Sequence, residues 1–157
     1  MKIDKVAIVS KFGSKKAEKA AKGIAEKLLK QKFKVYTISP VSVKGAKKVS
    51  SLEDLRKIKL DLVITLGGDG TTLRTFRNLE NETPLLTINI GGNRGILSEI
   101  FLDEIDNAIQ HIRKNKIWLD RRIRVIASCN NKQFQPALNE IYVNRKNLTK
   151  TAEFEIK

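Results

Sequence analysis

Up to about residue 115, the hydrophobic residues follow two patterns in turn. Short apolar runs rich in Val and Ile predict strands, whereas apolar residues three and four positions apart predict amphipathic helices. The predicted strands cover 6–10, 33–38, 62–66 and 85–90. The predicted helices cover 15–29, 52–58 and 71–79, and another begins at Asp103. Such alternation indicates parallel strands joined by crossover connections, so we expect a Rossmann-like α/β sheet.

Polar residues mark where two of these helices begin. Ser14 and Ser51 stand at the positions expected for N-caps, where a hydroxyl accepts a free backbone N–H. Glu53 and Asp54 then fall in a first turn, where the helix dipole favours acidic side chains. Residues 41–50 show no clear period, so we predict a loop there.

After Asn115 the pattern becomes that of an all-β segment. Residues 118–129 are rich in β-branched side chains and arginine. Further short strands with polar turns between them are predicted at 134–138, 141–143 and 152–156. The last of these reaches almost to Lys157, and an open sheet edge is an unusual place for a chain to end. We therefore expect a piece of a longer protein.

This change of pattern predicts two domains. Residues 1–115 are expected to form an α/β domain, and residues 116–157 the beginning of a truncated all-β domain. A chain of 157 residues is long enough for one domain and part of another.

The most informative stretch is 60–76, with the sequence LDLVITLGGDGTTLRTF. A fully apolar strand is followed by a glycine turn and then by the start of a helix. The N-terminus of a helix carries free N–H groups and a partial positive charge, and glycines let a ligand approach the main chain closely. The order of elements therefore predicts an anion-binding site at Gly68 and Gly70.

Asp69 is unexpected in such a turn, because a carboxylate repels a bound phosphate. It is suited to bind a metal together with phosphates, to accept a proton from an attacking hydroxyl, or to hold a sugar hydroxyl. The alternative is that Asp69 or Thr71 simply caps the following helix. Arg74 has two similar interpretations, since it could reach back to a phosphate or lie on a solvated helix face.

The composition narrows the function classes. A hydrophobic content of 41% is enough for a folded core, and no apolar run has membrane-spanning length. The single Cys129 argues against disulfides or a cysteine zinc site and is typical of a reducing cytoplasm, and the single His111 argues against a histidine metal cluster. The net charge of +14 favours polyanionic partners. The lysines are spread along the chain without interleaved aromatics, so a nucleic-acid module is disfavoured.

Three motifs together resemble those of the NAD kinase family, in its archaeal form. GGDGT at 67–71 resembles a motif of NAD kinases. Diacylglycerol kinases, sphingosine kinases and 6-phosphofructokinases share this motif more distantly. Asn93-Arg94-Gly95 resembles the family's N-x-G loop, and ALNE at 137–140 resembles its A-L-N-[DE] motif. The order of the motifs and the change from α/β to all-β agree over nearly the whole chain. One departure is ILSEI at 96–100, where the family usually has a Gly-Phe-Leu stretch.

The resemblance implies the N-terminal part of an enzyme that transfers the γ-phosphoryl of ATP, or of polyphosphate, to the 2′-hydroxyl of the adenosine ribose of NAD. It implies Mg²⁺ or another divalent metal, a cytoplasmic location, and a homodimer or homotetramer. It makes Asp69 the proton acceptor. It makes residues 1–115 a nucleotide-binding domain and residues 116–157 the beginning of an all-β NAD-binding domain. The nucleotide contacts would come from Gly68, Gly70, Arg74, Asn93, Asn139, Glu140 and Lys150.

Two other function classes remain open on the sequence alone. A diacylglycerol-type lipid kinase shares GGDGT, but it should carry a membrane-facing amphipathic or basic segment, and none is evident. A non-catalytic domain that binds polyanions or nucleic acid would account for the net charge of +14. It would not account for a carboxylate within a glycine turn. The pair Asn139 and Glu140 could also be no more than the polar end of a strand.

Overall fold

The computed structural model describes residues 2–79, 83–91 and 95–144, together with 149, 151, 153 and 155. The contacts within the chain divide it into two units, Met1–Asp120 and Arg121–Lys157. Each unit is described by itself. The predicted domain boundary near residue 115 remains a prediction.

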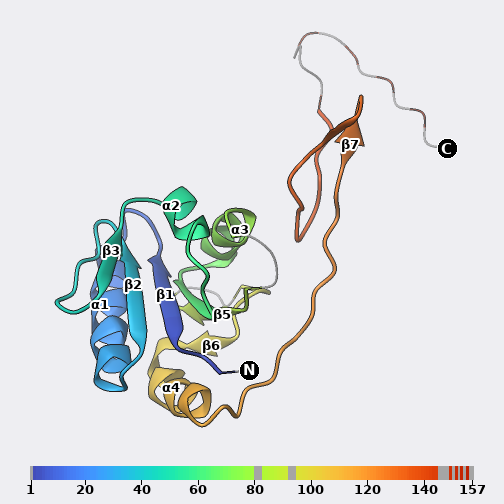
Figure 1. The fold of residues 1–157 in the computed structure, drawn as a ribbon. Helices are drawn as coiled ribbons and strands as arrows, with labels where there is room; N and C mark the ends of the chain where they lie inside the picture. The colour runs from blue at the N-terminus through green and yellow to red at the C-terminus, as the bar shows by residue number, and fades with distance from the viewer. Residues whose placement is uncertain are drawn as a thin grey trace. The chain divides into compact units, whose positions relative to one another are not determined.

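The first unit is built on a six-stranded sheet in which every paired neighbour is parallel, in the order β3-β2-β1-β4-β5-β6 (Figure 1). The strands are β1 Lys5–Ser10, β2 Lys34–Ile38, β3 Lys47–Val49, β4 Leu62–Leu66, β5 Leu85–Asn89 and β6 Ile100–Phe101. This sheet confirms the predicted Rossmann-like α/β class.

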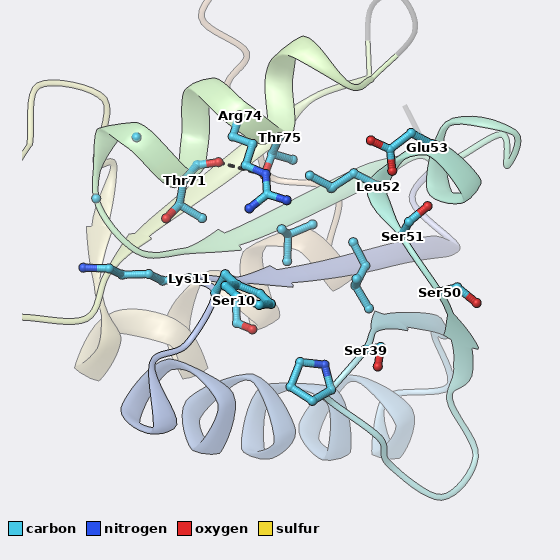
Figure 2. Close-up of a pocket in the computed structure, with 16 residues that line it drawn as sticks. Ser10, Lys11, Ser39, Ser50, Ser51, Leu52, Glu53, Thr71, Arg74 and Thr75 are labelled. Carbon is cyan, nitrogen blue, oxygen red and sulfur yellow. Dashed lines mark hydrogen bonds between the residues drawn. The ribbon is translucent and has the colours of Figure 1, made fainter.

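The helices cover both faces of the sheet. They are α1 Lys15–Lys30, α2 Leu52–Arg56, α3 Asp69–Arg77 and α4 Ile105–Arg113, the last preceded by the short 3₁₀ helix η1 Leu102–Glu104. The buried faces of α1 and α4 share one core cluster with the sheet, and α2 packs in a second cluster on the opposite face. Figure 2 shows α3 on the side of the sheet away from α1.

The predicted patterns have the expected physical basis. All five residues of β4 are buried, as a strand covered by helices on both faces requires. The buried stripe of α1 contains Ala17, Ala21 and Ala25, whose small side chains let the helix lie close to the sheet. Both predicted serine caps are present: Ser14 accepts the N–H of Ala17, and Ser51 accepts the N–H of Asp54.

Several predicted boundaries were wrong. Residues 41–50 are not only a loop, because β3 pairs there with β2. Lys47 and Lys48 are exposed on this strand, and charged side chains are typical of sheet edges, where pairing depends on the backbone rather than on an apolar pattern. The pattern also missed β6, which is too short to show one. Helix α3 begins at Asp69 rather than Thr71, and α2 ends at Arg56.

The second unit contains less strand than predicted. Its hairpin consists of β7 Ser128–Cys129 and β8 Lys132–Gln133, with an isolated antiparallel bridge between Val125 and Ala137. The antiparallel pairing agrees with the expected class, but 134–138 and 141–143 do not form strands. Tyr142 and Val143 are 84% and 72% exposed, so no facing layer within the described residues of this unit covers them. A short two-stranded hairpin alone gives little stability to further strands.

The predicted strand at 152–156 falls partly outside the described residues. None of the helices in the described parts of the chain has the length and apolar character needed to cross a bilayer.

Candidate active site

The strand order places a reversal of connectivity between β1 and β4. Strand β1 leads through α1 to β2 on one side, whereas β4 leads through α3 to β5 on the other. In open α/β sheets, ligands bind at such a switch point, beyond the carboxyl ends of the strands. The glycine turn follows β4 directly and therefore lies at this position.

A cavity of about 460 Å³ lies at the same edge of the sheet (Figure 2). Its wall on the side of α3 includes Gly68, Gly70, Thr71 and Arg74. Hydroxyl groups also line the cavity, together with apolar side chains such as Leu52. These hydroxyls belong to serines at the carboxyl ends of other strands. Ser10 is the last residue of β1, Ser39 follows β2, and Ser50 and Ser51 follow β3.

Arg74 extends from α3 into this cavity (Figure 2). Its positive charge interacts with the carboxylate of Glu53 on α2, which also lines the cavity. The pKa of Glu53 lies below its ordinary value, chiefly because its carboxylate accepts its own backbone N–H and the Ser51 hydroxyl, and further because of the charge of Arg74. Arg74 is exposed to solvent and also lines the cavity, so its contact with a phosphate stays a prediction.

The glycines of the turn differ in what surrounds them. A Cβ at Gly67 would lie 2.8 Å from the Cβ of Thr71, so this buried position is filled by the turn itself. Around Gly68 and Gly70 the corresponding space is open to 4 Å. The main chain of these two residues is thus accessible to a ligand, as the anion-site interpretation requires.

Asp69 is the first residue of α3, and its carboxylate does not cap the helix. The N-cap is Gly68, and no side chain of this turn makes the capping hydrogen bond. Instead, the backbone N–H of Ile96 donates to Oδ2 of Asp69 at 3.1 Å, and that of Leu97 donates to Oδ1 at 3.1 Å. The alternative in which Asp69 or Thr71 merely caps the helix is therefore wrong.

Through its Asn93-Arg94-Gly95 motif, the sequence singled out the loop that reaches Asp69, but it did not indicate that the N–H groups of Ile96 and Leu97 hold Asp69. Gly95 lies against the carboxylate, so closely that a Cβ would sit 2.6 Å from its Cγ. The one available signal was the glycine of the Asn93-Arg94-Gly95 stretch. The N–H groups of Ile96 and Leu97 belong to the backbone, which almost every residue type shares, so the sequence does not reveal their contacts. The cavity serines were missed for a related reason, since their strands are far apart in sequence.

The remaining predicted site residues are distributed as follows. Gly68, Asp69, Gly70 and Arg74 belong to one turn and helix of the first unit. Asn139 and Glu140 belong to the second unit, where both are exposed and follow the bridge residue Ala137. Asn93 and Lys150 lie outside the described residues.

Comparisons with known proteins point to one family. The model of the family described as the ATP-NAD kinase N-terminal domain matches residues 6–117. An NAD kinase of Thermoplasma volcanium is 28% identical over 152 residues, which are 97% of this chain and 53% of that protein. An NAD kinase of Clostridium beijerinckii is 34% identical over 110 residues, which are 67% of this chain and 38% of that protein.

Two solved structures resemble the fold. A yeast NADH kinase complexed with NADH superposes with a TM-score of 0.72 at 19% identity, covering 88% of this chain and 48% of that one. An NAD kinase from Archaeoglobus fulgidus in complex with ATP gives 0.54 at 20% identity, covering 82% and 45%. The chain spans about half the length of the curated relatives it matches most fully. With the family model matching most of the first unit, the chain belongs to the ATP-NAD kinase N-terminal domain family.

Proposed function

We propose that this chain is the N-terminal part of an NAD kinase, which transfers the γ-phosphoryl of ATP or polyphosphate to the 2′-hydroxyl of the adenosine ribose of NAD. The observation that carries the proposal is the position of Asp69. Asp69 stands at the switch point of the sheet, on the N-terminus of α3, between Gly68 and Gly70, which line the cavity although Asp69 itself does not. A carboxylate next to a glycine turn that could hold an anion suits transfer of a phosphoryl group to an alcohol.

In the proposed reaction, Asp69 accepts the proton of the ribose 2′-hydroxyl as its oxygen attacks the γ-phosphorus. The new O–P bond forms while the bond from the γ-phosphorus to the β-phosphate oxygen breaks, and ADP leaves; with polyphosphate as the donor, the polyphosphate shortened by one phosphate leaves. The free N–H groups at the start of α3 and the guanidinium of Arg74 would stabilise the charge on the phosphoryl oxygens. A correctly placed base contributes a factor of about 10²–10⁴ in rate.

The described residues do not form a resident site for the implied divalent metal. No group of three His, Cys, Asp or Glu side chains within the described ranges could hold an ion, and both oxygens of Asp69 already accept N–H groups. Mg²⁺ is commonly bound by one or two carboxylates together with substrate phosphates. We propose that the metal enters with the phosphates of the donor.

The second unit would serve the NAD side of the reaction. Glu140 is suited to accept two ribose hydroxyls, and Asn139 can both donate and accept hydrogen bonds to a sugar or an amide. Contacts from Asn93 and Lys150, a domain boundary near residue 115, and assembly into a homodimer or homotetramer are further parts of the proposal. A cytoplasmic location agrees with the free, exposed thiol of Cys129.

The test incubates the 157-residue chain, and the longest form that its gene encodes, with NAD, Mg²⁺ and either ATP or polyphosphate. NADP is scored with a coupled dehydrogenase. We expect NADP from the longer form with at least one donor. If neither donor yields NADP although NAD binds, the proposed reaction is rejected.

A prediction follows for the donor side of the cavity. Replacing Arg74 by Gln removes a guanidinium that would form charge-assisted hydrogen bonds of about 1.5–3 kcal/mol. We expect the KM for the donor to rise by about 10–100-fold, since 1.4 kcal/mol corresponds to a factor of ten. Arg77→Gln is the matched control, because Arg77 is also exposed on α3 but does not line the cavity. Equal effects of the two substitutions would rule out a specific role for Arg74.

A further inference from the structure

The carboxylate of Asp69 is held by main chain from a distant part of the sequence. The N–H groups of two consecutive residues, Ile96 and Leu97, each donate to a different carboxylate oxygen. Two fixed donors determine both the position and the plane of the carboxylate. About four lone-pair positions exist on its two oxygens, so roughly two remain for a substrate hydroxyl.

Gly95 makes this contact possible by lacking a side chain. The three atoms nearest to a Cβ built at this position are Oδ1, Cγ and Oδ2 of Asp69. Gly95 is not among the glycines with positive φ, whereas Gly91 has a φ of +131°. The backbone conformation at residue 95 would therefore accept alanine. The space around residue 95 would not accommodate the alanine Cβ, because the carboxylate of Asp69 occupies it.

The donor loop is in turn fixed to the sheet. The buried hydroxyl of Thr87 on β5 donates to the carbonyl of Leu97 and accepts the N–H of Glu99. The N–H of Glu99 also lies 3.0 Å from the carbonyl of Thr87. Leu97 itself is buried. The N–H groups that hold Asp69 thus come from a segment anchored on the strand next to β4.

We propose that Gly95 is a positioning residue for Asp69. Together with the N–H groups of Ile96 and Leu97, it forms a main-chain clamp that sets the direction of the carboxylate at the switch point. The clamp itself follows from the contacts described above. Its catalytic consequence rests on the proposed function, in which Asp69 receives the proton of the substrate.

The first test needs no catalysis. In the folded 157-residue chain, the ¹⁵N and ¹H shifts of the Ile96 and Leu97 amides are followed by NMR during an acid titration. We expect the shifts of both amides to change together on acidification, and we expect this response to be lost in Asp69→Asn and in Gly95→Ala. Gly23→Ala is the control, because that glycine lies in α1 with open space around it, and it should retain the response. Amides that do not respond in the unmodified chain would overturn the proposal.

The second test separates a clash with Asp69 from general damage. Gly95→Ala should lower the thermal midpoint in the unmodified chain but lower it much less in an Asp69→Ala background, where the obstructing atoms are absent. The double variant remains informative even if Gly95→Ala alone does not fold. Equal losses in both backgrounds would contradict the clamp.

The clamp and the proposed function can fail separately. In the form of the protein that makes NADP, Gly95→Ala should lower kcat more than it raises the KM for NAD, because the base is misdirected while the binding surface remains. Responding amides in a protein that makes no NADP would reject the kinase reaction and keep the clamp. NADP formation with silent amides would reject the clamp alone.

Discussion

Replacement of Asp69 by Asn is expected to lower the rate of NADP formation by a factor of about 10²–10⁴, the usual contribution of a general base. The amide of Asn cannot accept the proton of the ribose hydroxyl at neutral pH. It also presents an NH₂ group where the carboxylate accepts the N–H of Ile96 or Leu97, so one donor would face another. The measurement is kcat in the coupled assay, with the affinity for NAD determined separately.

The control for this prediction is Asp103→Asn, which removes the same charge from an exposed position in η1. It should leave kcat unchanged within a factor of about two, since surface substitutions away from a site alter little. Far-UV circular dichroism establishes that the Asp69 variant is folded. Turnover close to that of the unmodified protein, with NAD still bound, would eliminate Asp69 as the base.

The largest effect on stability is expected from Ile64→Ala. Ile64 lies in the middle of β4, is fully buried, and belongs to the core cluster shared with α1 and α4. Truncation of a buried Ile to Ala removes apolar burial and leaves a cavity, at a cost of about 2–5 kcal/mol. Domains of this size are stable by only about 5–15 kcal/mol, so a large fraction of the stability would be lost. The free energy of unfolding is measured by urea titration.

Ile123→Ala makes the same chemical change at a position that is 89% exposed in the second unit. It should alter the free energy of unfolding by no more than about 0.5 kcal/mol. A loss of stability for Ile64→Ala as small as that for Ile123→Ala would mean that β4 is not the centre of a packed core.

Prediction from sequence succeeded where one short segment contained its own signal. The apolar run of β4, the alanine-rich stripe of α1 and the serine caps of α1 and α2 all depend on neighbours within a few residues. Prediction failed where pairing depended on another segment. Strand β3 pairs with β2. The segment expected as a strand at 134–138 makes only the isolated bridge of Ala137 to Val125, and 141–143 is not assigned to a strand.

In the candidate site, too, the sequence predicted the features of one continuous segment but not the contacts between segments. The sequence by itself determined the Rossmann-like alternation, the glycine turn and the presence of a carboxylate in it, because strand, turn and helix N-terminus are consecutive. Only the tertiary structure decided what holds that carboxylate: Gly95 and the N–H groups of Ile96 and Leu97. The physical reason is that parallel strands bring the loops after β4 and β5 to one edge of the sheet, and that main-chain donors are the same in every residue type except proline.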